Sequence, residues 1–259
     1  GGIMQFTIDA KVMMKALEDI QGKGMYLGDK GFSNSKLGQY VVMELQDTTL
    51  SLWNGDTTFG LNLELTVVTA EENGTFIGSA EMIIPYLKKF GGNVNVAYDD
   101  FLTITSGNKK ASVPAAIQHP NMDAITRIKQ MVVDVEFETI PKRLWQFGSA
   151  KFEGCFQMIS ESFSDCMGLC ELVKSGVYKL DYDGEGVTLS TENGTANTYK
   201  ETLTVIQSIG EAATLQFSGP LHKFFKDTPL INFYVKDEFP LLIVGTDRMV
   251  VKAPFTRGD

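Results

Sequence analysis

The two halves of this chain repeat one order of sequence features. The first half contains TLSLWNGD from Thr49 to Asp56, and the second contains VTLSTENG from Val187 to Gly194. Each half then ends with an acidic turn between apolar strands, a Gly-centred turn and a last strand that stops at a proline, Pro114 or Pro254. An internal repeat of about a hundred residues or more predicts two copies of one domain, because solenoid repeats are much shorter.

Each half also carries two segments with helical signals. In the first half, Asp9 and Ser79 are suitable N-caps for helices over Ala10–Gln21 and Ala80–Phe90, and Gly91 follows the second helix. The rest of this half alternates like short strands joined by tight turns. We therefore expect an α+β domain of antiparallel strands with two helices.

The second half follows the same order. Pro141 suits the first turn of a helix, and a short helix is expected over Pro220–Phe225. The segment Phe152–Leu172 is compatible with an extension of the first of these helices or with a loop and a strand. The expected organisation is a domain over residues 4–115, a linker over 116–132 and a second domain over 133–255.

Composition describes a globular protein, with 43% hydrophobic and 21% charged residues and no apolar run long enough for a membrane helix. We expect no signal peptide, and we expect Cys155, Cys166 and Cys170 to be free, buried thiols. The net charge of -9 by itself argues against nucleic-acid binding. A protein of this charge can still be basic along one surface, so the arrangement of its lysines matters more than their sum.

Each of the four expected helices carries basic residues, with one histidine among them. For a single helix, a solvated surface is a sufficient explanation. Repetition in all four favours a basic surface that contacts phosphates without reading bases, provided that the helices lie on one side of the fold. The candidate DNA-binding residues are Lys11, Lys15, Lys88, Lys89, Lys142, Arg143, Lys151, His222, Lys223 and Lys226.

Catalysis has little support in the sequence, which has two histidines and no phosphate-loop, nucleophile-elbow or dinucleotide motif. The carboxylates of Asp181–Gly186 alternate around a glycine, which is more typical of a hairpin turn than of a calcium loop. Cys166 and Cys170 lack the second pair of ligands that a zinc site needs. We therefore expect no enzyme activity, no cofactor and no metal.

Several segments resemble the DNA sliding clamps. Asp237–Pro254 is similar to the closing strands of proliferating cell nuclear antigen and its archaeal relatives, whereas Phe6–Asp9, Asp47–Asp56 and His119–Asp123 are closer to the bacterial beta clamp. The resemblance implies a ring of six such domains built from three chains, with helices lining the hole and sheets outside. Duplex DNA would pass through the hole without sequence preference, and edge strands of neighbouring chains would pair.

The resemblance also implies partners: a clamp loader, and DNA polymerase and other replication proteins that dock through short peptides. The matching positions for such a peptide are Asn54, Gly55, Asp56, Met122, Ile125, Ile128, Pro240, Val251, Ala253, Pro254 and Phe255. The expected protein is a homotrimeric processivity factor that works by topology. It would act in the cytoplasm, at a nucleoid or viral replication site, or in the nucleus of a eukaryotic host.

Three alternatives stay open at this point. The chain could be one subunit of a heteromeric checkpoint-type clamp. It could be a viral processivity factor of the same fold that acts as a monomer or open dimer and is held to DNA by charge. The third alternative is an all-β enzyme or ligand-binding protein, which would present a concave pocket with perturbed titratable groups.

Overall fold

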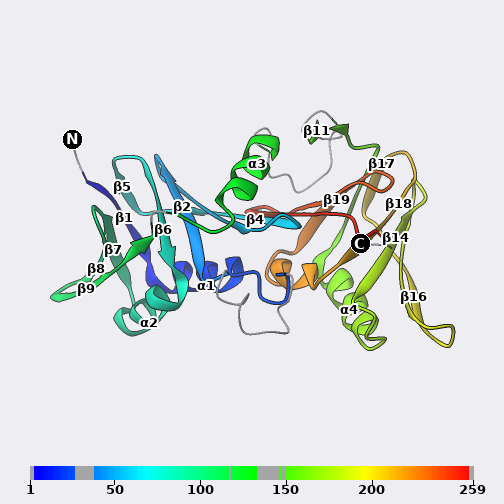
Figure 1. The fold of residues 1–259 in the computed structure, drawn as a ribbon, viewed down its shortest axis with the longest axis horizontal. Coiled ribbons are helices and arrows are strands. Elements are labelled where there is room, and N and C mark those ends of the chain that lie inside the picture. The colour runs from blue at the N-terminus through cyan, green and yellow to red at the C-terminus, as the bar shows by residue number, and fades with distance from the viewer. Residues whose placement is uncertain (1–2, 27–37, 117, 133–145, 148–149, 257–259) are drawn as a thin grey trace. The chain divides into compact units, whose positions relative to one another are not determined.

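The computed structural model describes residues 3–26, 38–116, 118–132, 146–147 and 150–256. The chain divides into two units, and strands dominate both (Figure 1). Unit 1 comprises Gly1–Thr57 and Leu61–Ile125, and unit 2 comprises Thr58–Gly60 and Thr126–Asp259. Within the described residues, no helix has the length and apolar character needed to cross a membrane.

Unit 1 contains two antiparallel sheets and two helices. One sheet has the order β5-β1-β7-β8-β9, and the other has the order β10-β6-β2-β3-β4. The elements are β1 (Met4–Asp9), α1 (Ala10–Ile20), β2 (Tyr40–Gln46), β3 (Thr49–Gly55), β4 (Phe59–Thr66), β5 (Thr69–Glu71), β6 (Gly74–Ser79), α2 (Ala80–Phe90), β7 (Asn93–Tyr98), β8 (Leu102–Ser106), β9 (Lys109–Val113) and β10 (Ala115–Ala116).

The helix α3 (Met122–Val132) begins in unit 1 and continues into unit 2, where a small hairpin of β11 (Gln146–Phe147) and β12 (Ala150–Lys151) follows it. The sheets of unit 2 have the orders β21-β20-β19-β13-β17 and β16-β15-β14-β18. The elements are β13 (Gly154–Ile159), α4 (Ser160–Glu171), β14 (Val177–Tyr182), β15 (Val187–Asn193), β16 (Asn197–Leu203), β17 (Gln207–Gly210), β18 (Ala213–Ser218), the 3-10 helix η1 (Leu221–Phe225), β19 (Leu230–Val235), β20 (Leu241–Val244) and β21 (Arg248–Lys252).

The two units share one topology, so the predicted duplication is confirmed. The order strand, helix, five strands, helix, three strands holds from β1 to β9 and again from β13 to β21. The sheet β5-β1-β7-β8-β9 corresponds strand by strand to β17-β13-β19-β20-β21, and β6-β2-β3-β4 corresponds to β18-β14-β15-β16. In this correspondence α1 matches α4, and α2 matches η1.

Each unit packs its helices on apolar sheet faces. In unit 1, Phe6 and Ile8 of β1 are 1% exposed, and Leu17 of α1 is fully buried. In unit 2, the Phe163 ring of α4 packs edge-on against the Phe233 ring of β19, with their centroids 5.0 Å apart. Burying a side chain of this size contributes about 1.5–3 kcal/mol, so these contacts hold the helices in place.

The start of the second domain differs from the expectation. The helix predicted from Pro141 lies outside the described residues, and Phe152–Leu172 contains a strand followed by the helix α4. Two sequence signals that would mark these elements are missing from this stretch. Five successive residues of β13 are buried, so no alternation marks the strand. The N-cap of α4 is Ile159, which has no side chain that can accept a hydrogen bond.

Candidate nucleic-acid and partner surfaces

The first two helices present exposed lysines as predicted from the sequence. Asp9 caps α1, because its Oδ1 accepts hydrogen bonds from the amides of Lys11 (2.9 Å) and Val12 (3.1 Å). Ser79 caps α2 by accepting one from the Met82 amide, and Gly91 ends that helix with a φ of 62°. These caps fix the start of α1 and both ends of α2, and the two helices pack against each other. The exposed lysines on the pair are Lys11, Lys15, Lys88 and Lys89.

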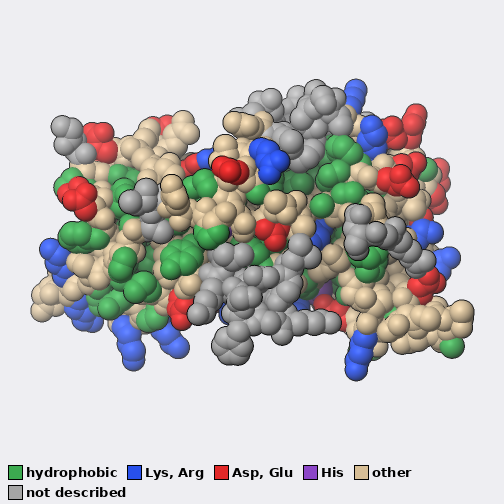
Figure 2. All heavy atoms as spheres, in the orientation of Figure 1, with side chains coloured by type: hydrophobic (Ala, Val, Ile, Leu, Met, Phe, Trp, Pro, Cys, Tyr) green, Lys and Arg blue, Asp and Glu red, His purple; other side chains and the backbone are tan. Residues whose placement is uncertain are grey.

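These lysines lie on the helical side of unit 1. In Figure 2, blue side chains project from the margin of the molecule where Figure 1 places α2. Lys88 and Lys89 occupy the last turn of α2, where cations interact favourably with the helix dipole. Lys109 and Lys110 are also exposed, on β9, which packs against α2. The basic surface of unit 1 therefore extends from the helices to the edge strand.

Unit 2 does not repeat this pattern in its first helix. The helix that corresponds to α1 is α4, which contains no lysine or arginine and exposes Glu161 and Asp165. The sequence places the third basic helix at Pro141, so α4 does not test the basic residues predicted for that helix. Lys142 and Arg143 lie outside the described residues, and Lys151 is exposed on β12.

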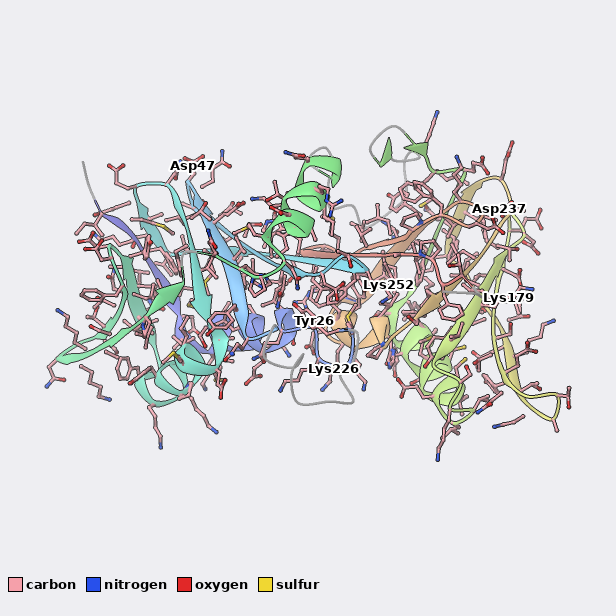
Figure 3. The ribbon with its side chains drawn as sticks, viewed as in Figure 1. Tyr26, Asp47, Lys179, Lys226, Asp237 and Lys252 are labelled. Atoms are coloured by element: carbon pink, nitrogen blue, oxygen red, sulfur yellow. The ribbon has the colours of Figure 1, made fainter. Side chains whose placement is uncertain are left out.

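The short helix η1 keeps two of its three predicted residues on the surface. Lys223 and Lys226 are exposed beside η1 (Lys226 is labelled in Figure 3). His222 is buried at 6% exposure, so the prediction that it contacts DNA is wrong. Its Nε2 lies 3.4 Å from Glu171 Oε1, and the Phe163 ring meets it edge-on. Burial lowers the pKa of His222, because it disfavours the charged imidazolium more than Glu171 favours it.

Asn54 belongs to the interior of unit 1, which contradicts its prediction as a peptide-binding residue. It is 1% exposed, and its Oδ1 accepts hydrogen bonds from Tyr26 Oη and the Gly55 amide. Its Nδ2 donates to the carbonyls of Ile20 (3.0 Å) and Gly38 (2.9 Å). Asn54 thus ties the end of α1 and the chain before β2 to β3. Gly55 and Asp56 are buried beside it.

His119 joins the same network. Its Nδ1 accepts from the Asn121 amide at 3.0 Å, so the proton of the neutral ring lies on Nε2, which faces Asn54 Oδ1 at 3.2 Å. His119 is 3% exposed. The His119–Asp123 segment therefore anchors the start of α3 within unit 1.

The apolar residues predicted in the linker fall on α3. Ile125 is 1% exposed, so it packs in the core instead of offering a docking surface, and Met122 is half-buried. Ile128 is half-buried and packs on Gly60, where a Cβ atom would lie 2.6 Å from Ile128 Cδ1. A glycine is needed at residue 60 for this close approach.

The C-terminal residues of the predicted peptide site line a hollow of about 700 Å³. Pro254 and Phe255 form part of its wall, and the Phe255 amide donates to the Gln216 carbonyl at 2.8 Å, which holds the tail along β18. Val251 is buried at 6% exposure, so its side chain is not accessible there, and Pro240 and Ala253 are half-buried. The other lining residues are Thr214, Leu215, Gln216, Asp237, Glu238 and Thr256.

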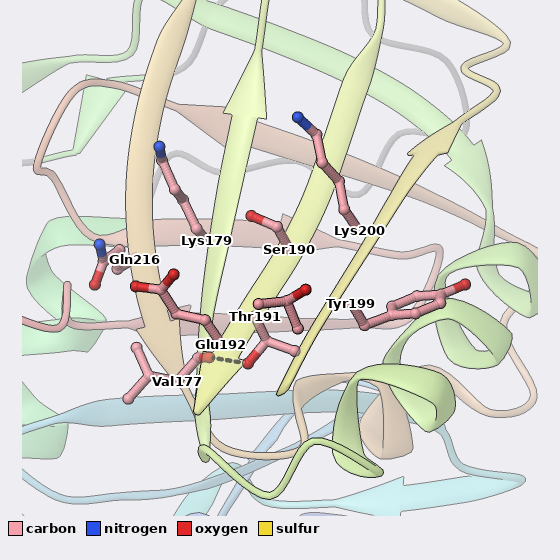
Figure 4. A pocket seen from close by; sticks show the side chains of 9 residues that line it. Val177, Lys179, Ser190, Thr191, Glu192, Tyr199, Lys200 and Gln216 are labelled. Carbon is pink, nitrogen blue, oxygen red and sulfur yellow. Dashed lines mark hydrogen bonds between the residues drawn. The ribbon is translucent and has the colours of Figure 1, made fainter. Parts of the chain in front are cut away.

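A second hollow, of about 470 Å³, lies on the face of the β14–β18 sheet and was missed by sequence reasoning. Gln216, Lys179, Ser190 and Lys200 are direct cross-strand partners in one row, and their side chains lie on one face in Figure 4. Lys179 is 3.6 Å from Asp181, which offsets part of its charge. Alternating polar residues in these strands indicate only a solvated face, so the sequence carries no stronger signal.

No group of three or more His, Cys, Asp or Glu side chains in the described part of the chain is arranged to hold a metal ion. Cys155, Cys166 and Cys170 are buried thiols, as predicted. The hydrogen bond from Cys166 to Cys170 raises the pKa of the Cys166 thiol, and burial raises it further, so this thiol stays neutral. Asp183 accepts from the amides of Glu185 and Gly186, which confirms the predicted hairpin turn.

No protein-family model matches the chain, and no curated protein matches it. Solved structures do match. A putative DNA polymerase III beta subunit from Eubacterium rectale matches 98% of the chain with a TM-score of 0.75 at 11% identity, and the chain spans 66% of that subunit. A. fulgidus PCNA, bound to the C-terminal region of FEN-1, matches 99% of the chain and is covered over 100% of its own length, with a TM-score of 0.69 at 13% identity.

A third match is the Helicobacter pylori beta clamp bound to a DNA ligase peptide, with a TM-score of 0.65 at 17% identity. The chain covers 66% of that clamp, and 98% of the chain is matched. The chain therefore has the sliding-clamp fold, with the two-domain extent of PCNA and about two thirds of the extent of a beta subunit.

Proposed function

We propose that the chain is a sliding clamp that encircles duplex DNA and tethers a replicative DNA polymerase to its template. In this role it is a scaffold and not an enzyme. The observation that carries the proposal is the duplicated domain, in which β9 of unit 1 and β16 of unit 2 are end strands of their sheets among the described residues. A contact between two different edges of identical chains is heterologous. Repeating it from copy to copy builds a closed ring when the rotations bring the last copy back to the first.

The packing inside unit 2 supports this mode of pairing. The outer edge of β21 lies beside the start of β4: the Ala253 amide donates to the Thr58 carbonyl at 2.8 Å, and Lys252 Nζ lies 5.6 Å from the centre of the Phe59 ring. By topology, β9 corresponds to β21, and β16 corresponds to β4. Among the described residues, neither β9 nor β16 has a second neighbouring strand. We therefore propose that β16 of one copy pairs with β9 of the next, and that three copies close the ring.

Phosphate contacts would come mainly from unit 1. Lys11, Lys15, Lys88 and Lys89 are exposed on two packed helices. Unit 2 would add Lys223 and Lys226, whereas the acidic face of α4 would repel phosphates. Such binding is independent of sequence and compatible with sliding.

Partner proteins would dock at the hollow beside Pro254 and Phe255. Phe255 is 38% exposed and supplies an apolar contact, and the exposed polar groups of Thr214, Asp237 and Glu238 surround it. Two of the matched clamps were solved with FEN-1 or DNA ligase segments bound. We propose that a polymerase peptide occupies this hollow, and that a clamp loader opens the ring.

The test of ring closure is absolute mass by light scattering across a concentration series. We expect the mass of three chains, and we expect Ser112→Lys on β9 to shift dissociation to higher concentration, because lysine on an edge strand opposes pairing. Thr103→Lys is the matched control, since Thr103 is the cross-strand partner of Ser112 one strand further in. A monomer at every concentration would instead favour a charge-held factor or a heteromeric subunit.

A further inference from the structure

The last turns of α2 carry an aromatic pair. Tyr86 and Phe90 are four residues apart, and their ring centroids lie 5.9 Å apart with the planes inclined by 56°. Lys109 Nζ, from β9, lies 5.9 Å from the centroid of Phe90. Tyr86 remains 39% exposed, so part of its ring faces solvent. We call these three residues, with Lys89, the aromatic–lysine cluster.

More apolar surface is exposed on the two packed helices. Met82 precedes Tyr86 by one helical turn and is 45% exposed, and Val12 on the packed helix α1 is 48% exposed. Single exposed apolar residues are ordinary on protein surfaces. Here three of them lie on one helix pair, among four exposed lysines. Green side chains accompany the blue ones in this part of Figure 2.

The chemistry of the cluster suits an unpaired nucleic-acid strand better than a duplex. A duplex turns phosphates and sugars outward and keeps its base faces stacked, so lysines suffice to hold it and an exposed aromatic ring gains little. A single strand offers both charged phosphates and free base faces. Proteins that bind single strands combine cationic grooves with aromatic side chains on which bases stack.

We propose that the aromatic–lysine cluster binds single-stranded DNA next to a duplex, with an unpaired base stacked on Tyr86. Lys89, one helical turn after Tyr86, and Lys109 hold the phosphates on either side of that base. The inference goes beyond the proposed function, because it adds a preference for DNA with a single-stranded segment. It uses the lysines assigned to duplex contact, but it does not require the ring to close.

The test compares three fluorescent probes by anisotropy with the full chain: a single strand, a blunt duplex, and the same duplex with a single-stranded overhang. Stacking of one base contributes a factor of about 5 to 150 in affinity. We expect Tyr86→Ala to weaken binding of the single strand and the overhang by a factor in this range, with blunt-duplex binding unchanged. Tyr86→Phe keeps the ring and should retain binding.

Phe101→Ala is the matched control, because Phe101 is an aromatic residue of the same unit that is 49% exposed at the turn between β7 and β8. Its replacement should change none of the three affinities. Equal losses on all probes after Tyr86→Ala, or no loss on any, would overturn the inference. A failure of the clamp proposal would give a different result. In that case the wild-type chain would not trimerise, but its Tyr86-dependent preference for unpaired DNA would persist.

Discussion

Replacing Asn54 with alanine should destabilise the protein strongly. The side chain makes hydrogen bonds with Tyr26 Oη, with His119 Nε2 and with the carbonyls of Ile20 and Gly38, all inside unit 1. Removing one partner of a buried hydrogen bond costs about 1–3 kcal/mol when the other partner stays buried. Two carbonyls, a hydroxyl and an imidazole lose their partner together, so at about 1 kcal/mol or more for each group the total should be at least about 4 kcal/mol. This is a large fraction of the about 5–15 kcal/mol that stabilises a typical protein.

The assay is urea unfolding followed by far-ultraviolet circular dichroism. Asn62→Ala provides a graded comparison, because Asn62 is also buried but donates only to Ser51 Oγ (2.8 Å) and the Leu52 carbonyl (3.0 Å). Its replacement should cost less than the replacement of Asn54. Asn95→Ala is the control, since its amide reaches Thr7 Oγ1 only at 3.5 Å, and the change should be close to neutral.

The reasoning fails if Asn54→Ala costs no more than Asn62→Ala. It also fails if the variant keeps its unfolding free energy and loses affinity for a partner peptide. That second result would restore Asn54 as a docking residue. The two readouts therefore separate the role given to Asn54 by its hydrogen bonds from the role implied by the sequence resemblance.

Three further predictions follow from local geometry. Gly210→Ala should lower the free energy of unfolding in urea by more than about 2 kcal/mol, because φ is 81° and a Cβ atom would lie 2.1 Å from a backbone oxygen. Gly194 has a φ of 75° but no atom near its missing Cβ, so Gly194→Ala is the control and should cost about 1 kcal/mol. The buried ring of His222 has a pKa lowered from 6.5, so as the pH falls the unfolded chain takes up a proton before the folded chain does. The free energy of unfolding should therefore fall as the pH drops from 6.5 through the folded-state pKa. A pH series of thermal unfolding should show a smaller fall for His222→Gln. Replacing Lys88 and Lys89 with glutamine should weaken duplex binding. The slope of log affinity against log salt concentration should decrease by about 1 for each phosphate that is no longer neutralised. An unchanged slope in a salt titration would show that these residues do not contact DNA.

The helices of unit 1 were predictable because their signals are local. Asp9 and Ser79 cap the helices through hydrogen bonds within three residues, and α2 begins and ends where the caps and Gly91 indicate. The duplication was visible for a similar reason, since turn residues recur at matching places in both halves.

The second half was less legible where signals are not local. β13 is buried on both faces by residues distant in sequence, and α4 begins without a side-chain cap, so neither periodicity nor capping marks them. The burial of His222 arises from packing against Phe163 and Glu171, and the role of Asn54 arises from hydrogen bonds to three other segments. Residue type alone did not distinguish these interior positions from surface sites.

Retention on circular DNA tests the central claim most directly. The protein would be loaded on a closed circular duplex, the salt concentration raised, and bound protein measured before and after the circle is cut once. The account predicts retention that resists salt on the closed circle and disappears on linearisation, because a ring leaves DNA only over an end. Equal dissociation from circular and linear DNA, with a steep dependence on salt, would contradict it and would mean that charge alone holds the protein to DNA.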